Sequence, residues 1–269
     1  DYRQDTNLFY LTGFEEPDSV LVFRPGLVPE TVMFVQPKDP LRETWDGFRF
    51  GPEGTREAFG IDRVYTINEI ENILPDLLTP VESVYYRMLH NSDFDRVFSR
   101  CLDTARSKLG RSGLGLKAIL DPTELIGEMR LFKSPKDIEF QKKACELTAE
   151  GHLAAMKFIK PGVTERQVEA VIRHSFMMNG SPRMGYSAIV ASGNGATTLH
   201  YNFNDQVCKD GELLLVDAGT EWNYYGGDIT RTFPVNGKFT DAQKAVYSHV
   251  LTAQKEILKM IRPGLEFKQ

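Results

Sequence analysis

Cysteine is scarce in this chain of 269 residues. Only three are present, Cys101, Cys145 and Cys208, and they lie far apart without forming a CxxC pair. This usage argues against a disulfide framework and excludes a zinc site built from neighbouring thiolates. It fits a reducing compartment, and we expect the protein to be cytoplasmic.

Long apolar runs and a strong imbalance of charge are also missing. No stretch approaches the ~18 consecutive apolar residues of a membrane span, and the net charge is −5 with an isoelectric point of about 5.7. We therefore expect neither nucleic acid nor a membrane as a partner. What is present is a globular composition, 41% hydrophobic and 26% charged, in a chain long enough for two domains.

Residues 1–128 mix short strands with helices, which predicts an α/β domain. Apolar and β-branched runs predict strands at Ser19–Phe23, Thr31–Val35 and Ser83–Tyr86. Helical spacing marks Phe94–Lys108 and also residues 67–78, where Pro75 is expected to interrupt the helix. The chain starts with Asp1 rather than Met, so we expect a fragment or a processed product.

Residues 129–269 form the second predicted domain. Ser134 and Pro135 suit the start of a helix that runs to about Ile159. Capping boxes at Thr164 and Thr240, each followed three residues later by Gln, predict two further helices, 165–178 and 241–261. A strand at 188–191 and a β-hairpin lie between them.

The hairpin carries two aspartates. Its predicted strands are Glu212–Ala218 and Asp228–Val235, and a turn centred on Trp222 and Asn223 places Asp217 directly opposite Asp228. Two carboxylates this close repel each other unless a divalent cation lies between them, as in two-metal aminopeptidases. The alternative is a differently registered hairpin in which one Asp is a turn or edge residue.

A short repeat suggests a duplication. KFIKPGV at 157–163 is similar to KMIRPGL at 259–265, and Gln141-Lys142 matches Gln243-Lys244 at the same offset. The alternative is a chance match, since Pro-Gly is common after a helix. If the duplication holds, the second copy is present only in part, and half of a two-lobed domain is missing from this chain.

Four segments resemble the superfamily of creatinase, aminopeptidase P, prolidase and methionine aminopeptidase, and aminopeptidase P most closely. They are YRQDTNLFYLTGFEEPDSVLVF at 2–23, FKSPKDI at 132–138, GYSAIVASGNGATTLHYNFND at 185–205 and LLVDAGTEWNYYGGDITRTFPVNGKFT at 214–240. The resemblance implies an α/β (α+β) fold. A creatinase-type N-terminal domain at 1–128 is followed at 129–269 by the first half of a duplicated pita-bread domain.

The resemblance also implies an activity and a metal site. The activity is release of the residue that precedes a proline at the second position of a peptide, with prolidase and a non-catalytic binding module as alternatives. Asp217 and Asp228 match two of five ligands for two divalent ions, most simply Mn²⁺, with Co²⁺, Fe²⁺ or Zn²⁺ as substitutes. The other ligands, one His and two Glu, find no match here, so we expect residues 1–269 alone to be inactive.

Further residues receive roles from the same resemblance. His200 matches an active-site histidine that contacts the substrate, although it could instead be a structural histidine. Tyr186 matches a position near the metals, or is a sheet-packing aromatic. Thr230 shares the predicted face of Asp228 and could orient its carboxylate. Related proteins form homo-oligomers, in which Trp45 would wall off a neighbour's pocket unless it is a core residue. His152 and His174 are predicted to be structural or solvent-facing.

Overall fold

The structure is a computed structural model that describes residues 2–112, 114–266 and 268. The chain divides into two compact units between Phe132 and Lys133. The predicted boundary after residue 128 falls inside helix α6 (Thr123–Leu131), so the units separate only after this helix has ended. Within the described residues, no helix combines the length and the apolar character that a membrane crossing requires.

The first unit is a mixed α/β domain, as predicted. Its strands are β1 (Val20–Phe23), β2 (Thr31–Val35), β3 (Arg63–Thr66), β4 (Ser83–Tyr85) and β5 (Ala118–Leu120). Its helices are α1 (Thr6–Thr12), α2 (Pro40–Asp46), α3 (Gly51–Phe59), the 3₁₀ turn η1 (Ile67–Glu69), α4 (Ile70–Leu78), α5 (Ser92–Leu109) and α6. One sheet has the order β1-β2-β3, and a second pairs β4 with β5 in parallel.

Helix α4 corrects one expectation. Pro75 does not interrupt it: the helix continues to Leu78, and the amide of Thr79 donates to the carbonyl of Pro75 at 3.2 Å. An internal proline costs roughly 3 kcal/mol because a backbone hydrogen bond is lost. Burial of Ile70, Leu74 and Leu78 in the core beside α5 opposes this cost.

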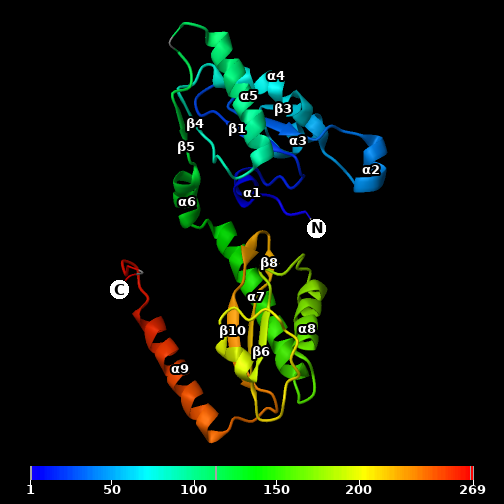
Figure 1. Cartoon of the computed structure of the whole chain (residues 1–269), viewed down its shortest axis with the longest axis vertical. Coiled ribbons are helices and arrows are strands. Elements are labelled where there is room, and N and C mark those ends of the chain that lie inside the picture. The colour runs from blue at the N-terminus through cyan, green and yellow to red at the C-terminus, as the bar shows by residue number, and fades with distance from the viewer. Residues whose placement is uncertain (1, 113, 267, 269) are drawn as a thin grey trace. The chain divides into compact units, whose positions relative to one another are not determined.

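The second unit is a three-stranded antiparallel sheet with two long helices packed on one face (Figure 1). Its helices are α7 (Pro135–Phe158), α8 (Glu165–Met178), the 3₁₀ turn η2 (Gly193–Thr197) and α9 (Asp241–Met260). Its strands are β6 (Ile189–Ser192), β7 (Leu213–Ala218), β8 (Glu221–Trp222), β9 (Tyr225–Gly226) and β10 (Ile229–Pro234). The sheet order is β10-β7-β6, and β8 pairs with β9 separately.

The three predicted helix starts of this unit are confirmed. The side chains of Ser134, Thr164 and Thr240 each accept a hydrogen bond from the backbone amide three residues on. The side chain of that later residue accepts in turn from the backbone amide of the cap. Each box satisfies two amides that the first turn of a helix leaves without partners.

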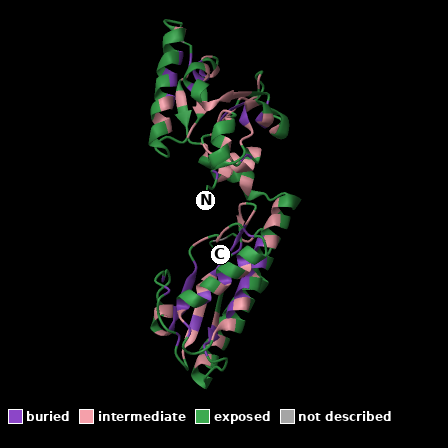
Figure 2. Cartoon of the chain, turned by 90° about the vertical axis from the view of Figure 1, so that its right-hand side faces the viewer, coloured by how far each residue is buried: buried purple, intermediate pink, exposed green. Residues whose placement is uncertain are grey.

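The central strand β7 separates the core from an open face. Leu214, Val216 and Ala218 are buried in a cluster with side chains of α7 and α8, whereas Leu213, Leu215 and Asp217 point to the other side. The sheet therefore presents Asp217 on the face away from the helices. Helix α9 buries none of its residues (Figure 2).

Candidate metal centre

The register of the hairpin differs from the prediction. Asp217 pairs with Thr230, and Ala218 pairs with Ile229. The tip is formed by Asn223 and Tyr224, whose φ angles of 46° and 67° are those of a two-residue turn with both central residues left-handed. The prediction of a turn centred on Trp222 and Asn223 is therefore wrong by one residue, and Asp228 is not directly opposite Asp217.

The two aspartates nevertheless share one face. Moving the turn by one residue shifts the pairing by two, and a shift of two keeps every side chain on its side of the sheet. Asp228 precedes β10 on the face of Thr230, which is the partner of Asp217. The two carboxylates are therefore diagonal neighbours.

Tyr186 joins the two carboxylates. Its hydroxyl lies 2.5 Å from Oδ1 of Asp217 and 3.1 Å from Oδ1 of Asp228. Burial, and then the two aspartates, raise the pKa of the Tyr186 phenol well above its usual value. The phenol thus keeps its proton. Of the two predictions for Tyr186, a residue close to the aspartates fits these contacts better than a sheet-packing aromatic.

Two glycines allow the hairpin to close between the aspartates. A Cβ atom at Gly219 would lie 1.7 Å from the carbonyl oxygen of Gly227. A Cβ atom at Gly227 would lie 2.3 Å from Oγ1 of Thr148 on α7. Any side chain at either position would push one aspartate away from the other.

Two side chains of helix α7 contact the backbone of the same hairpin segment. The backbone amide of Thr220 donates to Oγ1 of Thr148 at 3.1 Å, and Nε2 of His152 lies 3.3 Å from the carbonyl oxygen of Ala218. Thr148 and His152 are one helical turn apart and therefore face the hairpin together.

His152 is a neighbour of the site that sequence reasoning did not assign to it. It is 4% exposed, and Nδ1 has no partner among the described residues. A carbonyl can only accept, so Nε2 carries the proton and Nδ1 is bare. Burial lowers the pKa of His152, although Ala218, Ile229 and Asp217 act in the opposite direction. The structural reading of His152 is confirmed and the solvent-facing one is wrong.

His200 lies in an exposed turn after η2, and no hydrogen bond among the described residues joins it to the aspartates. Its neighbour Tyr201 is buried against Ile189 and Ala191, beside Leu215. Ile189 pairs with Asp217, so this cluster lies on the aspartate face of the sheet. The structure therefore gathers Tyr186, Asp217, Asp228 and Thr230, and brings the loop of His200 to the same face.

Trp45 is 86% exposed on α2, close in sequence to the exposed Leu41 and Phe48. The alternative that it is a core tryptophan is therefore wrong. Exposed apolar side chains grouped on one short segment are typical of a contact surface.

The aspartate pair fits a divalent ion in part. Carboxylate oxygens are suitable ligands for Mn²⁺ and similar ions, which take four to six ligands. Among the described residues, no group of three or more His, Cys, Asp or Glu side chains is placed to hold a metal. This chain therefore offers two carboxylates toward a metal centre.

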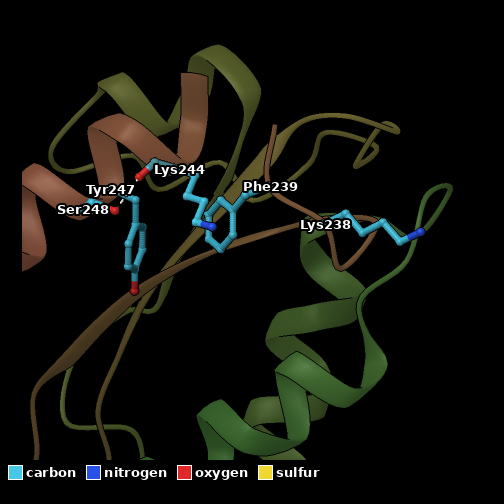
Figure 3. Close-up of a pocket in the computed structure, with 5 residues that line it drawn as sticks. All are labelled: Lys238, Phe239, Lys244, Tyr247 and Ser248. Carbon is cyan, nitrogen blue, oxygen red and sulfur yellow. Dashed lines mark hydrogen bonds between the residues drawn. The ribbon is translucent and has the colours of Figure 1, made fainter. Parts of the chain in front are cut away.

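A hollow elsewhere in this unit has a different character. It lies where β10 leads into α9 and is lined by Lys238, Phe239, Lys244, Tyr247 and Ser248 (Figure 3). Lys244 lies beside the two rings, whose centroids are 5.1 Å apart, while Lys238 extends away from them. The hollow includes none of the predicted site residues, so the aspartate face remains the candidate site.

Comparison with known proteins defines the class. Residues 139–269 match the metallopeptidase family M24, and residues 1–85 match the N-terminal domain of aminopeptidase P. The chain therefore contains a region of the M24 metallopeptidase type and an N-terminal region of the aminopeptidase P type. Its relatives include Xaa-Pro aminopeptidases.

Two of these are the Xaa-Pro aminopeptidases of Haemophilus influenzae and Escherichia coli, both 38% identical, over 100% and 98% of this chain. The solved structure of Pseudomonas aeruginosa aminopeptidase PepP superposes with a TM-score of 0.95 at 39% identity. A zinc-substituted E. coli aminopeptidase P in complex with product gives 0.93.

The chain spans about 60% of the length of the two bacterial relatives. The match to the P. aeruginosa structure covers 100% of this chain and 61% of that chain. The match to the E. coli structure covers 98% of this chain and 60% of that chain. The similarity extends through both units of the chain.

Proposed function

We propose that the protein is a dinuclear-metal aminopeptidase that releases the N-terminal residue from peptides with proline at the second position. One observation carries this proposal: Tyr186 joins Asp217 and Asp228 on the open face of the sheet. The proposal is supported by two relatives of that activity, each 38% identical over at least 98% of the chain.

Asp217 and Asp228 would hold the divalent ions, most simply Mn²⁺, with Co²⁺, Fe²⁺ or Zn²⁺ as substitutes. When bound, such ions supply Lewis acidity and lower the pKa of water toward neutrality. The remaining ligands would be one His and two Glu outside residues 1–269. On this proposal residues 1–269 alone do not catalyse.

The other site residues would act on the substrate or on the ligands. The Tyr186 phenol, which donates to both carboxylates, would hold them in place or donate to substrate. Thr230, opposite Asp217 in the ladder, would orient the ligand carboxylates. His200, on the loop that reaches this face, would donate to the oxygen that gains charge at the scissile carbonyl.

A dipeptidase of the prolidase type is the second candidate, and a non-catalytic peptide-binding module is the third. The match of residues 1–85 to the N-terminal domain of aminopeptidase P favours the aminopeptidase over the dipeptidase. The presence of both aspartates and their shared phenol argues against a binding module.

Peptides of matched length separate these candidates. The full-length protein with Mn²⁺ is expected to release alanine from Ala-Pro-Ala but not from Ala-Ala-Ala. Cleavage of Ala-Pro alone would favour the dipeptidase, and binding without cleavage would favour the module. Asp217→Asn and Asp228→Asn are each expected to lower kcat/KM by at least ~100-fold, whereas Asp241→Asn, in the first turn of α9, leaves it unchanged.

The proposal extends to partners and compartment. The exposed group of Leu41, Trp45 and Phe48 supports a homo-oligomer, a dimer or tetramer, formed in part through this segment. Light scattering of Trp45→Glu against wild type tests it, and an unchanged mass removes this surface from the interface. Two cysteines buried in separate units and one exposed, Cys145, support a reducing compartment such as the cytoplasm.

A further inference from the structure

Glu165 is a completely buried carboxylate at the start of α8. Its Oε1 accepts from the backbone amide of Ser192 at 2.6 Å and from the Ser192 hydroxyl at 2.8 Å. Its Oε2 accepts from the Tyr201 hydroxyl at 2.9 Å and from the backbone amide of Gln206 at 3.0 Å. Burying a carboxylate is costly unless it is fully hydrogen-bonded, and here four donors surround it.

These four bonds close one loop. Ser192 ends β6 on one side, and Gln206 lies on the other, so that residues 193–205 run between two backbone amides tied to the same carboxylate. His200 lies within this loop, directly before Tyr201.

Asn204 adds a second attachment for the loop. Its Oδ1 accepts from the amide of Val190 at 3.0 Å, and its Nδ2 donates to the carbonyl of Ala188 at 2.8 Å. The side chain thereby satisfies backbone groups at β6. The loop is thus fixed on the strand whose Ile189 pairs with Asp217.

Only a carboxylate suits the position of Glu165. It offers two oxygens and no donor, and each oxygen receives one backbone N–H together with one hydroxyl. An amide of the same shape would direct its NH₂ group at one of those backbone amides and leave a buried donor unpaired. The helix N-terminus adds a favourable field for negative charge.

We propose that Glu165 is a positioning residue: it fixes the loop of residues 193–205 so that His200 is held over the aspartate face. This inference rests on the function proposed above for His200. Glu165 itself does not touch substrate, because it is sealed beneath Ser192 and Tyr201.

The first test is a double-mutant cycle in the full-length enzyme with an Xaa-Pro tripeptide. His200→Ala is expected to lower kcat/KM about 100-fold, as loss of a donor to the developing oxyanion does. Glu165→Gln is expected to lower it about tenfold, mainly in kcat, and by less than twofold in the His200→Ala background, because both changes act through one group.

Two variants serve as companions to Glu165→Gln. Glu169→Gln lies one turn further on α8 and keeps an acceptor for Nδ2 of Asn204, so less than a twofold change is expected. Tyr201→Phe removes one bond to Glu165 without leaving a backbone amide unpaired. It is expected to lower kcat about threefold, and it keeps the test valid if Glu165→Gln does not fold.

The outcomes separate the two proposals. Wild-type activity in His200→Ala overturns the role of His200. A large effect of His200→Ala with wild-type activity in folded Glu165→Gln and Tyr201→Phe overturns the role of Glu165 alone. The role of Glu165 is also overturned if the losses of kcat/KM from Glu165→Gln and His200→Ala simply multiply in the double mutant.

Amide hydrogen exchange gives a readout that does not depend on activity. Glu165→Gln is expected to raise the exchange rates of residues 193–206 at least tenfold, while residues in the centre of α7 keep their protection. Uniformly faster exchange across the second unit would show general destabilisation and overturn the positioning role.

Discussion

The two aspartates of the candidate site reach each other through a third side chain. The phenol of Tyr186 donates toward both carboxylates, so that two negative groups on one face share a single proton donor. Hydrogen bonds to charged acceptors are stronger than neutral ones. The arrangement offsets part of the repulsion between carboxylates when no cation is near.

Tyr186→Phe tests this at the level of one atom. Without the hydroxyl, the metal-free protein is expected to lose about 1–3 kcal/mol of unfolding free energy, measured by urea titration in EDTA. The control Tyr247→Phe, whose ring packs on Phe239, is expected to change it by less than ~0.5 kcal/mol. Equal losses in both variants would contradict a special contact at Tyr186.

His152 gives the second unit a predictable dependence on pH. Its pKa in the folded protein lies below the ordinary 6.5 because it is buried. Above pH 6.5 the group is neutral in both states and contributes nothing. As the pH falls below 6.5, the unfolded chain binds a proton that the folded chain does not, and stability is lost until the folded pKa is reached.

His152→Gln removes this titration. Between pH 7.5 and 5.5 the melting temperature of the wild type is expected to fall more than that of His152→Gln, as followed by circular dichroism. The exposed His174 provides the matched control, and His174→Gln should follow the wild-type curve. Parallel curves for wild type and His152→Gln would show that the imidazole does not titrate differently on folding.

At the scale of elements, the hairpin between β7 and β10 depends on close backbone contact. Gly219→Ala is expected to destabilise the second unit by more than ~3 kcal/mol, because its Cβ has no room beside Gly227. Gly226→Ala, in the same hairpin, meets nothing within 4 Å and is expected to stay within ~1 kcal/mol of wild type. Urea unfolding of both variants measures the difference, and similar midpoints would contradict the steric account.

Elements whose signals are local could be predicted from the sequence. The N-cap at Ser134, the capping boxes at Thr164 and Thr240 and the presence of the hairpin are confirmed, because each depends on residues a few positions apart. The predicted turn lies one residue too early because Tyr224 adopts a positive φ, which is rare for a bulky residue and cannot be predicted from its type. The contacts of Glu165 and His152 depend on strands far away in sequence, so no local pattern could show them.

At the scale of the whole molecule, each of the two units has a buried cysteine in one of its hydrophobic clusters. Cys101 packs with α4 in the first unit, and Cys208 packs with the sheet and α8 in the second. Burial raises the pKa of the Cys208 thiol to about 11, with Glu165 adding to the effect. Cys145 on α7 is exposed.

Thiol labelling is expected to follow this division. In native buffer one cysteine, Cys145, reacts rapidly, and Cys145→Ser abolishes the fast phase. The other two react only on unfolding, so mass spectrometry of labelled peptides along a urea gradient reports each unit separately. Fast native labelling of Cys208 would contradict the buried core of the second unit.

The pairing of the hairpin runs in one register from Leu213–Pro234 at its base to Trp222–Tyr225 beside its tip. The face of the sheet on which each aspartate lies therefore depends on this register. Adding two residues at Asn223 would lengthen the turn and leave both carboxylates on the open face. A slip of the pairing by one residue would instead place Asp228 on the helix-packed face, so both carboxylates stay on the open face only while this register holds.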